Sequence, residues 1–96
     1  MKETIYEIIA STVREMGEEL GNETLQNVNE ETKLFGEGGA LDSLALVSLI
    51  ADIEDKIDDT FNRSVVLADE RAMSQRTSPF RNVGTLCHYV EKLLND

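Results

Sequence analysis

The chain has no tryptophan, one cysteine and one proline, and each shortage restricts what it can be. A single cysteine, Cys87, cannot form an internal disulfide, which fits a reducing compartment. Aromatic residues make up 5% of the chain, so aliphatic side chains must build most of the core. The near absence of proline, together with long stretches of periodic apolar residues, favours helices over strands.

Long apolar runs are also missing, and none approaches the roughly 20 residues needed to span a bilayer. The N-terminal residues Met1–Thr4 lack the apolar centre of a signal peptide. We therefore predict a cytoplasmic protein with no membrane span. The 96 residues predict one domain, 1–96, which is too small for a deep active-site cleft and which we expect to be a monomer.

Basic residues are few, with 9 against 19 acidic residues and a net charge of −10. Such a surface repels phosphate backbones, which excludes nucleic acid as a partner. Residues 1–59 hold 15 acids and 4 bases, a net charge of −11, whereas residues 60–96 hold 4 acids and 5 bases, a net charge of +1. We expect basic patches on partner proteins to dock onto the first part of the chain.

Three stretches have apolar residues at helical spacing. Residues 3–20 predict an amphipathic helix, residues 43–58 a second and residues 83–94 a third, with Asn82 as a candidate N-cap. Their expected buried stripes are Ile5, Ile8, Ile9, Val13, Met16 and Leu20; Leu46, Leu49, Ile50, Ile53 and Ile57; and Val83, Leu86, Cys87, Val90 and Leu94.

Two connecting segments lack a sustained period. Residues 21–42 predict a long loop in which Leu34 and Phe35 pack onto the core. Within residues 60–82, 65–67 predict a short extended piece and 69–75 a short helix, before a break at Pro79. The predicted fold is all-α, a four-helix bundle of three main helices and one short helix.

The run from Gly38 to Leu44 is the most informative stretch of the chain. Its glycines allow the chain to bend, and Asp-Ser-Leu then leads directly into the second helix. Ser43 is therefore expected at the start of that helix, with an acid, Asp42, before it. Ser43 alone is equally consistent with an N-cap residue, and so is Asp42.

A second, short apolar stripe follows Ser43 on the side of the helix opposite the core. It consists of Leu44, Val47 and Ala51, and the acids Glu54, Asp55 and Asp58 continue it. Two interpretations stay open for the apolar residues: partner contact, or burial under residues 60–80. The acids are either docking residues or a solvated face.

Catalysis and metal binding find little support. A serine hydrolase would need a base near Ser43, and the single histidine, His88, lies on the third helix without a nucleophile-elbow motif. Cys87 belongs to the buried stripe of that helix. Cys87 and His88 alone cannot make a zinc site, and the acids of residues 52–59 do not match a calcium loop.

The Asp-Ser-Leu motif, the glycines before it, the helix order and the acidity together resemble the acyl carrier protein family. The resemblance covers nearly the whole chain and is strongest from Gly39 to Ile57. It implies that Ser43 bears 4′-phosphopantetheine, transferred from coenzyme A by a phosphopantetheinyl transferase that Asp42 helps to recruit. The protein would then be a phosphoprotein and a carrier without catalytic residues of its own.

The resemblance further implies that an acyl group travels as a thioester on this arm between acyl-activating and acyl-transferring enzymes, as in fatty acid biosynthesis and other lipid metabolism. Family members in fatty acid synthesis commonly have acids soon after the serine, where this chain has Ala45 and Ser48. Residues 62–82 also look longer and include Arg63, Arg71, Arg76 and Arg81, which would either contact partners or neutralise the acidic helix. A dedicated aminoacyl or polyketide-type carrier, or an unmodified helical adaptor, are the alternatives.

Overall fold

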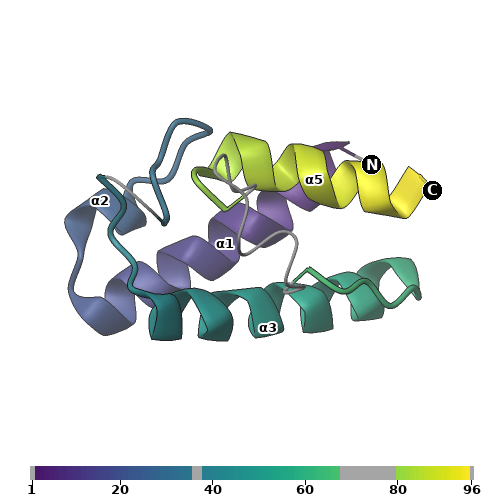
Figure 1. Cartoon of the computed structure of the whole chain (residues 1–96), viewed down its shortest axis with the longest axis horizontal. Helices are drawn as coiled ribbons and strands as arrows, with labels where there is room; N and C mark the ends of the chain where they lie inside the picture. The colour runs from purple at the N-terminus through teal and green to yellow at the C-terminus, as the bar shows by residue number, and fades with distance from the viewer. Residues whose placement is uncertain (1, 36–37, 68–79, 96) are drawn as a thin grey trace.

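The computed structural model describes residues 2–35, 38–67 and 80–95 (Figure 1). Most of them belong to four helices: α1 (Lys2–Leu20), α2 (Glu23–Gln26), α3 (Ser43–Phe61) and α5 (Val83–Asn95). These ranges contain no strand, only one isolated antiparallel bridge between Lys33 and Asn82. The described part of the chain is thus all-α, as predicted. The short helix expected at 69–75 lies outside it.

The helices are arranged around α1, which packs against each of the other three. α3 and α5 run in the direction opposite to α1, and α1 lies between them in the view of Figure 1. Across residues 2–35, 38–67 and 80–95 no helix combines the length and the apolar character required to cross a membrane.

The core consists mainly of the predicted stripes. Every residue expected to be buried on α3 and α5 is buried, and α1 contributes Ile5, Ile9, Val13 and Met16. Two predicted members of the α1 stripe differ: Ile8 is only half-buried against the core, and Leu20, the last residue of α1, is 55% exposed. Gly21, with φ +65°, follows Leu20 directly and ends the helix at this point.

The predicted end of α3 was three residues too early. Asp58-Asp59-Thr60 are polar, but Phe61 follows Ile57 by four residues and is half-buried against the core, so the helix continues to Phe61. It ends at Asn62, which has φ 55° and ψ 39° and donates its N–H to the Asp58 carbonyl at 2.9 Å. Asparagine tolerates this left-handed conformation, which makes it a frequent helix terminator.

The loop predicted over residues 21–42 contains the four-residue helix α2, which the sequence did not reveal. One turn holding a single buried apolar residue, Leu25, is too short to produce a period. The predicted packing of Leu34 and Phe35 is confirmed, with Leu34 fully buried and Phe35 half-buried against the core. Leu34 N–H donates to the Arg81 carbonyl at 2.9 Å, which ties the loop to the residues before α5.

Candidate functional site at the start of α3

Asp42, not Ser43, caps α3. Its backbone is extended (φ −83°, ψ 177°), and its carboxylate Oδ1 accepts the N–H of Ala45 at 2.8 Å. The Asp42 carbonyl accepts the first helical hydrogen bond, from Leu46 N–H at 2.9 Å. The alternative in which Ser43 is the N-cap is therefore wrong, because that position is already filled by the preceding residue.

Ser43 is the first residue inside the helix, and it is exposed. Within the described ranges its hydroxyl makes no hydrogen bond, and neither do the N–H groups of Ser43 and Leu44. The first amides of a helix have no intrahelical partner, and they lie at the positive end of its dipole. The start of α3 thus presents a free hydroxyl beside two free backbone donors, an arrangement that suits a phosphate ester.

The loop before Ser43 is fixed by its backbone. Leu41 N–H donates to the Leu34 carbonyl at 2.9 Å, and both side chains are buried. The chain closes this turn through Gly38, which has φ +79°, and Gly39. A Cβ on Gly39 would lie 2.8 Å from the Leu34 carbonyl carbon and oxygen. These glycines therefore permit a close approach that positions Ser43, in addition to the bending expected from the sequence.

The start of α5 differs sharply from that of α3, because the chain itself satisfies its amides. Val83 N–H donates to the Thr32 carbonyl at 3.0 Å and Gly84 N–H to the Glu30 carbonyl at 2.8 Å. Thr85 N–H donates to Asn82 Oδ1 at 2.8 Å, which confirms Asn82 as the N-cap. No free donor of this kind is left for a ligand at α5.

The outer face of α3, defined by Leu44, Val47, Ala51, Glu54, Asp55 and Asp58, is largely open. Leu44 is 81% exposed, Val47 47%, and Ala51 is also exposed. Residues 62–67 and 80 therefore do not bury these three side chains, and the rest of the 60–80 segment that the alternative invoked, 68–79, lies outside the described residues. Asp55 and Asp58 are exposed as well.

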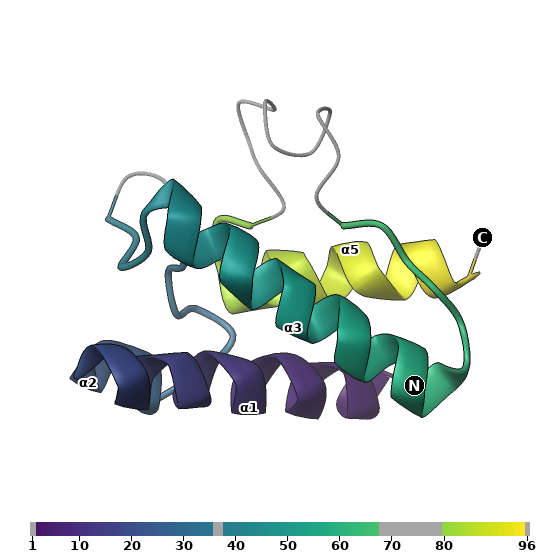
Figure 2. The same cartoon turned by 90° about the horizontal axis from the view of Figure 1, so that it is seen from below.

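Glu54 differs from its neighbours on the outer face, because it is half-buried and has a structural contact. Its Oε2 accepts the backbone N–H of Leu67 at 2.7 Å, and the Leu67 side chain is fully buried. Residues 62–67 leave the end of α3 and turn back along it, as Figures 1 and 2 show; we call them the strap. The hydrogen bond from Leu67 therefore fastens the strap to α3.

The strap gives a structural role to Arg63, one of the four arginines for which the sequence left partner contact and charge neutralisation as alternatives. Arg63 Nη1 donates to the carbonyl of Leu94, close to the end of α5. A cationic donor there satisfies a terminal carbonyl and complements the negative end of the helix dipole. Arg81 is exposed, and its backbone carbonyl accepts the N–H of Leu34. Arg71 and Arg76 lie outside the described residues.

Sequence reasoning missed Val66, which is 68% exposed on the strap. Three of the four large apolar side chains exposed in the described ranges are Leu44, Val47 and Val66, and the fourth is Leu20. Val66 stands in a segment without a period, so no pattern in the sequence separates it from the buried Leu67.

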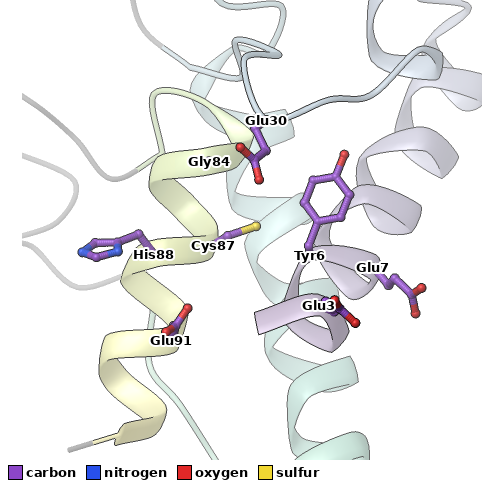
Figure 3. Close-up of a pocket in the computed structure, with 8 residues that line it drawn as sticks. All are labelled: Glu3, Tyr6, Glu7, Glu30, Gly84, Cys87, His88 and Glu91. Atoms are coloured by element: carbon purple, nitrogen blue, oxygen red, sulfur yellow. The ribbon is translucent and has the colours of Figure 1, made fainter. Parts of the chain in front are cut away.

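A groove of about 610 Å³ lies between α1 and α5, away from the predicted site (Figure 3). Its lining includes Tyr6, Gly84 and Cys87, with glutamates around them. Cys87 points toward α1, whereas the His88 ring projects away from it in Figure 3. In the ranges that the structure describes, no three His, Cys, Asp or Glu side chains are grouped so that they would hold a metal ion.

Comparison with protein-family models gives no match, and neither do comparisons with curated proteins and with solved structures. The resemblance to acyl carrier proteins therefore rests on residues of this chain: the Asp-Ser-Leu motif, the helix order and the acidic charge. To these the structure adds the exposed position of Ser43 in the first turn of α3 and the open outer face beside it.

Proposed function

We propose that this protein is a carrier of the acyl carrier type, with 4′-phosphopantetheine attached to Ser43 by a phosphopantetheinyl transferase. The arm, when attached, supplies a terminal thiol on which an acyl group is held as a thioester. The chain itself contributes the attachment hydroxyl, the helix end that surrounds it and a face on which enzymes dock. In this proposal it performs no catalysis and adopts the acyl-carrier-like variant of the helical bundle.

The observation that supports this proposal most strongly is the open start of α3. Ser43 offers an exposed hydroxyl with no competing hydrogen bond in the described part of the chain. The unbonded N–H groups of Ser43 and Leu44 can donate to phosphate oxygens once the ester has formed. Asp42 holds the first turn together through its hydrogen bond to Ala45, so the hydroxyl is presented from an ordered helix.

The proposed partners follow from the outer face of α3. Leu44 stands next to the modified serine, so any enzyme acting there must approach it. Asp55 and Asp58 are exposed, and the only ion pair in the described ranges joins Lys56 to Glu15, at 3.2 Å. The acids thus remain available to basic patches on the transferase and on acyl-activating or acyl-transferring enzymes.

The proposal is tested by intact mass after incubation with coenzyme A and a broad-specificity phosphopantetheinyl transferase. The wild-type chain is expected to gain one arm, and Ser43→Ala none. Ser48→Ala is the matched control, because Ser48 is an exposed serine on the same helix. Since Ser43 is not the cap, Ser43→Ala should leave the unfolding transition nearly unchanged. An unmodified wild type would favour the helical adaptor, whereas a modified Ser43→Ala variant would place the arm elsewhere.

A dedicated carrier for an aminoacyl or polyketide-type cargo is the second candidate, and Ala45 and Ser48 favour it. Ala45 is half-buried and packs against the core, so an acid there would lose hydration. The absence of an acid at this position is thus tied to the packing of α3. Partners that rely on acids soon after the serine would find none in this chain between Ser43 and Asp52.

A further inference from the structure

We infer that Glu54 is a positioning residue, and that it holds Val66 in place as the outermost apolar contact of the surface on which the phosphopantetheinyl transferase docks. This inference rests on the proposed function. The sequence led us to expect a direct contact between Glu54 and partners, whereas this inference gives Glu54 an indirect role. It also adds a contact residue, Val66, from the strap.

The geometry of the strap places Val66 beside the outer face of α3. The Leu67 amide nitrogen lies 2.7 Å from Glu54 Oε2, and the Cα of Val66 is about 2.4 Å from that nitrogen along the chain. Glu54 follows Val47 by two helical turns and Ala51 by one, so all three share a side of the helix. Val66 therefore borders the end of the stripe that begins with Leu44.

The surface that results has an apolar residue near each end and acids between and beside them. Leu44 and Val66 are 81% and 68% exposed, and with the 47% exposed Val47 they lie along one side of α3, where grouped apolar side chains indicate an interaction surface. From Leu44 to Glu54 the helix rises about 15 Å. A surface of this length suits an enzyme that has two apolar contacts and basic residues facing Asp55 and Asp58.

The transferase is the occupant that the observations favour. It must bring its active site to Ser43, adjacent to Leu44, so its contact surface begins at this end of α3. The acids of residues 1–59, with a net charge of −11, attract a basic surface to the same part of the chain. The strap itself is fixed at both ends, by Glu54 to Leu67 and by Arg63 to the Leu94 carbonyl. Val66 is thus held in position before the enzyme arrives.

Four variants separate a positioning role of Glu54 from a direct charge contact. Val66→Asn removes the apolar contact, and Leu20→Asn is its matched control, because Leu20 is 55% exposed at the end of α1. Glu54→Ala removes the acceptor for Leu67 N–H, whereas Glu54→Gln keeps an amide oxygen that accepts it and removes only the charge. The measurements are kcat/KM for loading from coenzyme A, and hydrogen exchange at the Leu67 amide.

We expect Val66→Asn and Glu54→Ala each to lower kcat/KM for loading about fivefold, and Leu20→Asn and Glu54→Gln to leave it nearly unchanged. Exchange at the Leu67 amide should accelerate in Glu54→Ala but little in Glu54→Gln. The double variant Glu54→Ala with Val66→Asn should load no more slowly than either single variant, because both remove the same contact.

Three results would overturn the inference. Val66→Asn loading at the wild-type rate would show that this residue makes no contact. Glu54→Gln loading as slowly as Glu54→Ala would show that the charge itself meets the enzyme. A double variant with a fully additive loss would show two independent contacts. Failure of the wild type to acquire any arm would instead overturn the proposed function, and this inference with it.

Discussion

Helices α3 and α5 begin in opposite ways, although each follows a connecting segment and each has a side-chain cap. At α5 the amides of Val83 and Gly84 donate to carbonyls of the loop around residue 31, and Asn82 caps Thr85. At α3 Asp42 caps Ala45, while the described ranges supply no acceptor for the amides of Ser43 and Leu44.

This difference separates a structural helix end from one available to a ligand. The first amides of α5 are used within the fold, since they donate to carbonyls of the loop that runs from α2 to α3. Among the described residues, the start of α3 is held by the Asp42 carboxylate and by the loop before it, through the Leu41 backbone and buried side chain. Its exposed hydroxyl and free donors are what a phosphate ester would need.

Among the substitutions that test this comparison, Gly39→Ala should have the largest effect on the free energy of unfolding. A Cβ there would meet the Leu34 carbonyl at 2.8 Å, so the Gly39→Ala variant forces backbone to move. We expect the free energy of unfolding, measured with denaturant, to fall by about 1–3 kcal/mol, because the atoms that the Cβ would meet belong to the backbone and cannot move aside as a side chain can. Loading of Ser43 should slow as well, because the displaced loop leads into α3. Unchanged stability would show that the loop relaxes freely and does not fix the site.

Much of this arrangement could be predicted from the sequence, for identifiable reasons. The buried stripes of α3 and α5 were predictable because each helix is long enough to show a period. The position of Ser43 at the start of α3 was predictable because glycines and an acid precede an apolar run. The choice of N-cap could not be predicted, since Asp42 and Ser43 are both good caps, and only the backbone angles and hydrogen bonds of the structure distinguish them.

Long-range contacts escaped prediction for a different reason. The hydrogen bond from Leu67 to Glu54 spans 13 residues, and the bond from Arg63 to the Leu94 carbonyl spans 31. Neither partner stands in a motif that marks it. From the sequence, Glu54 was therefore grouped with Asp55 and Asp58 as a docking or solvated acid, and Val66 could not be distinguished from its buried neighbour Leu67.

Removal of each N-cap side chain should have the next largest effect on the free energy of unfolding. The two variants allow a direct comparison of the starts of α3 and α5. Asp42→Ala and Asn82→Ala should each lower the free energy of unfolding by about 0.5–2 kcal/mol, because each leaves a helix amide without its acceptor. Only Asp42→Ala should slow loading of Ser43, since α5 has no part in it. Equal effects on loading would mean that global stability, not the local start of α3, limits the reaction.

Asp42→Asn refines this comparison. Asparagine caps helices about as well as aspartate, so stability should return nearly to the wild-type value. Loading that stays slow in this variant would assign the carboxylate charge a part in recruiting the transferase. Loading that recovers fully would show that Asp42 acts through the cap alone.

The smallest expected effect comes from charge along the outer face of α3. Asp55→Lys should slow loading, whereas Ser48→Glu, which adds an acid nearer Ser43 at an exposed position, should accelerate it. An exposed ion pair contributes about 0.2–1 kcal/mol, so each change corresponds to roughly a 1.4- to 5-fold difference in kcat/KM.

Glu19→Lys on α1 is the control for this charge effect, because it makes the same change in net charge at an exposed position on another helix. Raising the salt concentration should shrink the effects of Asp55→Lys and Ser48→Glu, since the Debye length is about 10 Å at 0.1 M and shorter above it. If Glu19→Lys slows loading as much as Asp55→Lys, net charge and not the outer face attracts the enzyme. The acids of the outer face would then have no specific part in recognition, which would depend on the open start of α3 and the apolar side chains beside it.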